Sequence, residues 1–157
     1  MKTVHLDFGH GGKDPGATGN GLREKDVVLS VGLKVGKELE RHGVKVTYSR
    51  KNDTFIELRE RANMANRAKA DVFVSIPCTA FTNASAQGLE TFHFAGSANG
   101  KKLATSVQNS IMAAKLYNRN RGIKTANFAV LRHTSMPAAL VELGFITNSQ
   151  DASLLKS

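Results

Sequence analysis

Three residues of this sequence combine a side chain that acid–base and metal-dependent chemistry uses with a position that could form a site: His10, Glu24 and Glu142. His10 lies between Gly9 and Gly11 directly after a buried strand pattern, so its imidazole is free to point into a cleft. A lone loop histidine more often caps backbone groups. A glutamate at the start of a helix is favoured by the helix dipole whether or not it binds anything. Neither His10 nor Glu24 is decisive by itself.

Glu142 is harder to explain as a structural residue. It lies within the apolar run 140–145, which is typical of a buried strand, and an unpaired carboxylate there would carry a large desolvation cost. A salt bridge to an arginine such as Arg132 would remove that cost. Alternatively, a carboxylate at the end of a strand can serve as a general base beside a metal-bound water. Both interpretations of Glu142 stay open at this point.

The other histidines and the single cysteine support weaker hypotheses. His5 alternates with apolar residues in the first strand and is expected to be structural, and His42 follows a helix end, where a cation interacts favourably with the dipole. The spacing of His93 and His133 does not assign either of them to a site. Cys78 is interpreted as an ordinary buried thiol.

The elements that must position these residues follow from apolar periodicity. We predict strands at about 2–8, 44–48, 72–76, 88–94 and 136–145, and helices at about 24–42, 54–68 and 100–116. The second helix is expected to begin with a capping box, Thr54 to Glu57. This order predicts a single α/β domain with a twisted, mostly parallel sheet and helices on both faces. Ligands of such sheets bind at the carboxyl ends of the strands, where the glycine-rich loop 9–16 lies.

The composition of the chain limits the cellular setting and the kinds of partner that we expect. The chain has 157 residues, one cysteine and a formal net charge of +9. One cysteine excludes an internal disulfide framework, and we expect no signal peptide and no membrane span, because no long apolar run is present. The positive charge favours a polyanionic partner, either nucleic acid or the anionic polymers of a bacterial cell wall. Nucleic acid is disfavoured, because the basic residues are spread along the chain and no recognition motif is present.

The chain resembles a known family in three separated blocks that occur in the same order. The blocks are Leu6-Asp7-Phe8-Gly9-His10-Gly11-Gly12-Lys13-Asp14-Pro15-Gly16-Ala17, Gly21-Leu22-Arg23-Glu24-Lys25-Asp26 and Val141-Glu142-Leu143-Gly144-Phe145. They are similar to the signatures of the zinc-dependent N-acetylmuramoyl-L-alanine amidases of phage endolysins and sporulation lysins. The similarity extends over nearly the whole chain, including Leu58-Arg59-Glu60-Arg61-Ala62-Asn63 and Asn127-Phe128-Ala129-Val130-Leu131-Arg132.

This resemblance implies a peptidoglycan hydrolase that cleaves the amide between N-acetylmuramic acid and L-alanine. It implies that His10 and Glu24 are zinc ligands and that Glu142 is the catalytic glutamate. A second histidine of the family normally follows the 72–76 strand, but this chain has Pro77 there, and Thr79 stands where the family usually has asparagine. Proline offers no side-chain donor, whereas a catalytic zinc commonly uses three protein ligands. Zinc is therefore expected to be lost or weakly bound.

Three interpretations of Pro77 follow. The chain has kept the fold and lost activity, it recruits a substitute ligand such as Cys78, or the substitution was introduced by engineering or sequencing. Side chains alternate along a strand, so Cys78 should point to the face opposite Pro77, which argues against the substitute. The competing hypothesis to hydrolysis is a non-catalytic peptidoglycan-binding relic.

The resemblance also sets expectations for the whole protein. The family usually continues into one more helix, so the catalytic domain 1–157 is interpreted as possibly truncated, with no wall-binding module. Truncation would expose apolar surface and favour association of an otherwise monomeric protein. The expected partners are peptidoglycan and anionic wall polymers. We expect synthesis in the cytoplasm and action on the cell wall after release.

Overall fold

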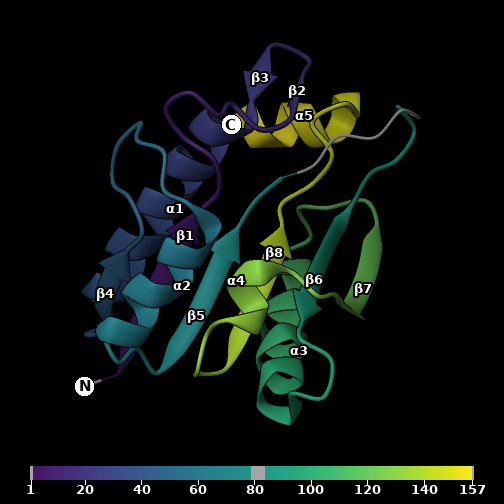
Figure 1. The fold of residues 1–157 in the computed structure, drawn as a ribbon. Helices are drawn as coiled ribbons and strands as arrows, with labels where there is room; N and C mark the ends of the chain where they lie inside the picture. The colour runs from purple at the N-terminus through teal and green to yellow at the C-terminus, as the bar shows by residue number, and fades with distance from the viewer. Residues whose placement is uncertain (1, 79–83, 157) are drawn as a thin grey trace.

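A computed structural model describes residues 2–78 and 84–156 of the chain (Figure 1). The strands are β1 (Thr3–Phe8), β2 (Thr18–Gly19), β3 (Leu22–Arg23), β4 (Lys45–Tyr48), β5 (Val72–Ile76), β6 (Leu89–His93), β7 (Asn120–Thr125) and β8 (Ala138–Glu142). The helices are α1 (Glu24–Arg41), α2 (Leu58–Arg67), α3 (Ala98–Ala113), α4 (Ala129–Arg132) and α5 (Ser149–Lys156). None of the helices in these ranges is long and apolar enough to cross a membrane.

Six strands form one sheet in the order β4-β1-β5-β8-β6-β7, and β2 pairs with β3 in a separate small hairpin. All neighbouring pairs of the large sheet are parallel except β6 and β8, which run antiparallel. The carboxyl ends of β1, β5 and β8 therefore lie side by side at one edge, toward the hairpin and α5 (Figure 1). This confirms the expected α/β class with a mostly parallel sheet.

The two faces of the sheet carry separate apolar clusters, because side chains alternate along each strand. Residues of β1, β5 and β8 pack with α1 on one face, with partly buried residues of α3 beside them. Phe73 and Leu140 pack with α2 and α4 on the other face. Between α1 and α3 an open apolar groove of about 360 Å³ remains, lined by valines and leucines of both helices and the sheet. Helices thus cover both faces, as the periodicity predicts.

The predicted capping box at Thr54 is wrong. α2 begins at Leu58, its N-cap residue is Glu57, and the Glu57 side chain forms no capping hydrogen bond among the described residues. The Thr54 hydroxyl instead donates to the side chain of Asn52, while Asp53 accepts from the backbone of Gly12 at 2.7 Å. Asp53 therefore ties the chain to the glycine-rich loop, and residues 54–57 lie outside the helix.

The sequence patterns missed the short helices α4 and α5, and they also missed two β elements. β7 is a polar edge strand with little apolar alternation, and β2–β3 is a hairpin of two-residue strands. Polar side chains are common on edge strands because they discourage pairing with other chains. Both elements were therefore invisible to a search for apolar periodicity.

Candidate functional site

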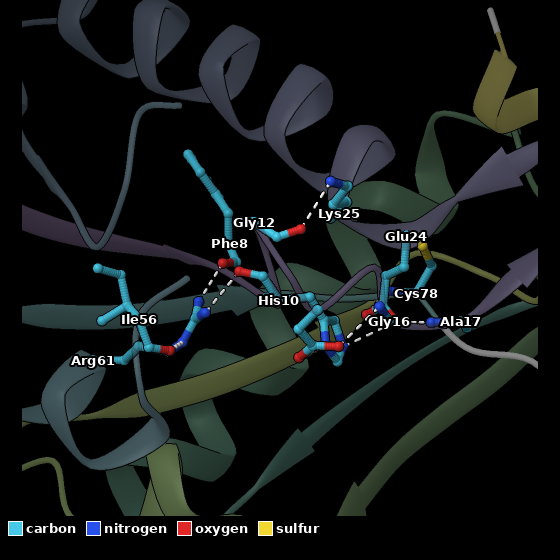
Figure 2. Close-up of polar contacts among 12 residues, drawn as sticks. Phe8, His10, Gly12, Gly16, Ala17, Glu24, Lys25, Ile56, Arg61 and Cys78 are labelled. Atoms are coloured by element: carbon cyan, nitrogen blue, oxygen red, sulfur yellow. Dashed lines mark hydrogen bonds and ion pairs between the residues drawn. The ribbon is translucent and has the colours of Figure 1, made fainter. Parts of the chain in front are cut away.

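The loop after β1 holds His10 in an unusual conformation. His10 has φ of 62°, in the left-handed region that favours glycine. Two buried arginines hold the carbonyl groups around it: Arg61 donates to the carbonyl oxygens of Phe8 and His10, and Arg50 donates to that of Gly9 at 2.8 Å. Figure 2 shows Arg61 reaching the loop from α2. These contacts fix the backbone that carries the imidazole.

The imidazole of His10 lies between two carboxylates. Its Nε2 is 3.1 Å from Oε1 of Glu24, and its Nδ1 is 2.7 Å from Oδ2 of Asp14. The hydrogen bond to Glu24 is the main reason that the pKa of His10 is raised to about 9, with Asp14 adding to the effect against desolvation. Gly16 is required beside this pair, since a Cβ atom there would lie 2.5 Å from the His10 ring.

Glu24 is buried at the first position of α1 and is held from several sides. Its Oε1 also accepts from the backbone of Ala17 at 3.0 Å, and its Oε2 accepts from the backbone of Cys78 at 3.1 Å. The carboxylate therefore links the loop after β1 to the chain after β5 (Figure 2). Oε1 of Glu24 is the oxygen that faces His10, as a shared metal ion or an ion pair would require.

Glu142 ends β8 and lines the same cavity as His10 and Glu24. Its Oε2 is buried and has no hydrogen-bond partner among residues 2–78 and 84–156. Burial, followed by the charges of Glu24 and Glu90, raises the pKa of Glu142 to about 8. The salt bridge to Arg132 considered from the sequence is absent in these ranges, and Arg132 donates to Asn127 at 2.9 Å instead. A carboxyl group in this setting is suited to exchanging a proton near neutral pH.

The cavity has a volume of about 460 Å³ and two unlike sides. One side carries titratable groups, among them His10, Asp14, Glu24 and Glu142. The other side is formed by apolar residues of the segment before α2, the start of α2 and the start of α4. Its lining residues are Phe55, Ile56, Leu58, Phe128, Ala129 and Val130. A ligand in this cavity can therefore contact both polar and apolar side chains.

The position expected for a third metal ligand provides no side-chain donor. Pro77 lines the cavity, and Thr79 lies outside the described residues. Cys78 belongs to the apolar cluster on the α1 face, burial raises the pKa of its thiol, and Figure 2 shows its sulfur on the side of Glu24 away from the His10 ring. Within the described ranges no three histidine, cysteine or acidic side chains are grouped to hold a metal. His10 and Glu24 alone do not make a three-ligand zinc site.

The other histidines lie away from this cavity. His5 stacks on Phe73 with ring centroids 5.7 Å apart, and burial lowers its pKa. His42 faces Glu38 at the end of α1, His93 contacts the carbonyl of the residue after it, and His133 follows α4. The structural interpretation of His5 and His42 agrees with these contacts.

Sequence reasoning missed Asp14, Arg50 and Arg61 as parts of the site. Asp14 follows His10 by four residues within the glycine-rich loop, and this spacing was an available signal. Arg61 belongs to a block that carries the family resemblance, but no pattern indicates that its side chain would reach β1. It forms a buried ion pair with Asp7 at 3.0 Å, and Asp7 also accepts from Ser75 at 2.8 Å. These contacts join α2, β1 and β5 beneath the site.

A histidine and carboxylates in a cavity at the carboxyl ends of parallel strands are typical of a hydrolytic enzyme of the α/β class. Residues 4–157 match the family described as N-acetylmuramoyl-L-alanine amidase, and the chain belongs to that family. The match covers both the glycine-rich loop and the strand that ends in Glu142.

Individual relatives agree with this assignment. The chain is 46% identical over 157 residues to N-acetylmuramoyl-L-alanine amidase LytC of Bacillus subtilis (strain 168), covering 99% of this chain and 32% of that protein. It is 43% identical to the endolysin of Bacillus phage SPP1, covering 99% of this chain and 59% of the endolysin. The chain thus spans about a third to three fifths of the length of these relatives.

A solved structure shows the same fold. N-acetylmuramoyl-L-alanine amidase AmiC2 of Nostoc punctiforme superimposes with a TM-score of 0.94 at 42% identity, covering 99% of this chain and 86% of that one. The expected family and architecture are therefore confirmed, while the roles of His10, Glu24 and Glu142 stay predictions.

Proposed function

We propose that this domain binds peptidoglycan in the cavity beside His10 and hydrolyses the amide between N-acetylmuramic acid and L-alanine. The observation that carries the proposal is that Glu142 lines a cavity together with His10 and Glu24, while its buried Oε2 has no hydrogen-bond partner among the described residues. A buried carboxylate without a partner is costly, so a protein retains one where it has a chemical use. Membership of the amidase family supplies the bond that is cut.

Glu142 is assigned the proton transfers. In the hydrolysis, the oxygen of a water molecule joins the amide carbon and the C–N bond breaks. Glu142 accepts a proton from that water and delivers a proton to the departing amine of L-alanine. The pKa of about 8 places this group close to the range where it can do both.

His10 and Glu24 are assigned to the metal that the family resemblance implies, and Asp14 orients His10 through Nδ1. These two donors leave a zinc ion one protein ligand short of the usual three. We therefore expect this chain to bind zinc weakly and to hydrolyse peptidoglycan slowly.

A second candidate function is recognition of peptidoglycan without cleavage. Pro77 favours it, because proline removes a donor at the position where the family normally has histidine. The cavity and the net charge of +9 would be retained in such a binding protein. The two candidate functions differ only in whether the bound amide is cleaved.

The experiment measures binding and cleavage on the same material. Purified dye-labelled cell walls are incubated with the protein, with and without added zinc, and both sedimented protein and released dye are measured. Dye release that is abolished by Glu142→Gln supports slow hydrolysis. Sedimentation without release supports recognition alone. Absence of both sedimentation and release would contradict each candidate.

We also propose that the domain acts on the bacterial cell wall, where anionic polymers would attract its positive charge. The names of the relatives, which include a phage endolysin, support this place of action.

A further inference from the structure

Several large apolar side chains that line the cavity are exposed. Among the described residues, the large hydrophobic side chains classed as exposed are Val35, Phe55, Leu58, Leu116 and Phe128. Three of them, Phe55, Leu58 and Phe128, line the cavity that contains Glu142. Phe55 and Leu58 lie around the start of α2 and Phe128 directly precedes α4, so two segments far apart in the sequence line one cavity. Exposed apolar side chains that gather beside a cavity mark a contact surface for a ligand.

This surface, which we call the apolar wall, consists of Phe55, Ile56, Leu58, Phe128, Ala129 and Val130. It is held in place before any ligand arrives. Phe128 packs edge-on against Phe92 with ring centroids 5.5 Å apart, and the ammonium of Lys13 lies 5.0 Å from the centre of the Phe55 ring. The wall therefore offers a preformed surface, which lowers the entropic cost of binding.

The apolar wall is also tied to the loop that carries His10. Nε of Arg61 donates to the carbonyl oxygen of Ile56 at 2.7 Å, and the same guanidinium donates to the carbonyl oxygen of His10 at 2.8 Å. Figure 2 shows Arg61 between Ile56 and the His10 loop. A ligand placed against the wall is thus held at a set position relative to the polar side of the cavity.

Charge decides which part of the substrate fits this wall. The scissile amide has an uncharged acyl side, made of a lactyl group on an N-acetylated pyranose ring, and an amine side that is a peptide with free carboxylates. None of the six wall residues is charged or has a polar side chain. Burying a carboxylate against such a surface costs free energy, because the charge loses its hydration. Methyl groups and the C–H face of a pyranose ring instead bind favourably to aliphatic and aromatic side chains.

We propose that the apolar wall binds the muramoyl side of the substrate and thereby selects for glycan-linked peptides over free peptides. This inference rests on the proposed function, because it assumes that the scissile amide lies at Glu142. It adds a specificity-determining surface that acts through contact and not through proton transfer.

The test compares Leu58→Ser and Phe128→Ser with Leu116→Ser as a matched control. Leu58 and Leu116 are exposed to nearly the same extent, 60% and 58%, but Leu116 does not line the cavity. The probes are N-acetylmuramoyl-L-alanyl-D-isoglutamine and the free dipeptide L-alanyl-D-isoglutamine. Affinities are measured by calorimetry in a buffer with a metal chelator, and circular dichroism checks that each variant is folded.

We expect Leu58→Ser and Phe128→Ser each to weaken binding of the muramoyl dipeptide about tenfold, which corresponds to the loss of roughly 60 Å² of apolar contact. Binding of the free dipeptide should not change, and Leu116→Ser should match the unsubstituted chain with both probes. Binding of the muramoyl dipeptide alone, with no detectable binding of the free dipeptide, would also support the assignment.

Two results would overturn the inference while leaving the proposed function in place. Equal weakening of both probes would assign the wall to the peptide, and wall variants that bind as Leu116→Ser does would remove the wall from recognition. If the unsubstituted chain binds neither probe and does not sediment with purified walls, the proposed function itself fails and the inference fails with it.

Discussion

At the scale of single residues, Pro77 decides how many donors face the site. His10 and Glu24 already point at each other across 3.1 Å, and Pro77 lines the same cavity without contributing a donor. We predict that Pro77→His raises zinc affinity by more than about tenfold, since even indirect partners of a metal contribute that much. Elemental analysis after dialysis should find about one zinc per chain in this variant.

Cys78→Ser is the control for that prediction. The sulfur of Cys78 lies in the apolar cluster on the α1 face, so its replacement should leave the zinc content unchanged. Equal zinc content in Pro77→His and the unsubstituted chain would contradict the assignment of position 77. A loss of zinc in Cys78→Ser would show that the cysteine is a ligand after all.

The carboxyl group of Glu142 should make the folded state sensitive to pH. Its pKa is raised from 4.5 to about 8, so between these values the unfolded chain releases a proton that the folded chain keeps. Stability therefore falls as pH rises through this window, by up to about 1.4 kcal/mol for each pH unit. Glu142→Gln removes this dependence and should be more stable than the unsubstituted chain at pH 8, while it abolishes cleavage.

Thermal unfolding between pH 5 and pH 9, in a buffer with a metal chelator, measures this effect. The other titrating groups are shared by both proteins, so the difference between the two melting temperatures isolates Glu142. A difference that stays constant with pH would mean that Glu142 is ionised throughout and that its burial is offset by a partner.

At the scale of elements, the buried pair of Arg61 and Asp7 joins α2 to β1. Both side chains are almost fully buried and their charged atoms are 3.0 Å apart. Arg61→Gln leaves the Asp7 carboxylate without its charge partner, and we predict a loss of about 3–5 kcal/mol in the free energy of unfolding. Denaturant titration measures the change.

Arg67→Gln provides the control on the same helix. Arg67 pairs with Glu60 on an exposed surface, where such pairs contribute at most about 1 kcal/mol. If the two substitutions lower the free energy of unfolding by the same amount, the buried pair of Arg61 and Asp7 is not what joins α2 to the sheet.

The packing of α1 on β1 depends on a glycine inside the helix. A Cβ atom at Gly32 would lie 2.0 Å from a ring carbon of Phe8, whereas alanine is otherwise favoured over glycine in helices by about 1 kcal/mol. We predict that Gly32→Ala destabilises the chain by roughly 1–3 kcal/mol, because overpacking exceeds the gain in helix propensity.

Ser30→Ala tests helix propensity alone, since Ser30 is exposed on the same helix. It should leave the denaturant midpoint unchanged or raise it slightly. A stabilising effect of Gly32→Ala would show that α1 can shift away from Phe8 without cost.

At the scale of the whole molecule, the net charge of +9 should govern association with the cell wall at long range. Exposed charges are screened over about 10 Å at 0.1 M salt, so sedimentation with walls that carry anionic polymers should decrease as salt is added. Walls stripped of those polymers should show weaker sedimentation and little response to salt. Equal salt dependence on both materials would assign the attraction to peptidoglycan itself.

The sequence alone determined the family, the α/β class and the residues at the carboxyl ends of the strands. Apolar alternation and helical periodicity are local signals, so β1, β5, β8 and α1 could be predicted close to their observed bounds. The three blocks that carry the resemblance contain His10, Glu24 and Glu142, and these residues do line one cavity.

Only the tertiary structure decided how those residues are surrounded. Contacts between segments distant in sequence raise the pKa of Glu142 and bring Arg61 to the loop that carries His10. Such contacts also place Phe55 and Phe128 in the lining of one cavity. The capping box predicted at Thr54 fails for a related reason, because the adjacent Asp53 is bound to the distant glycine-rich loop and α2 begins only at Leu58. Burial and proximity are properties of the packed chain, and no local pattern encodes them.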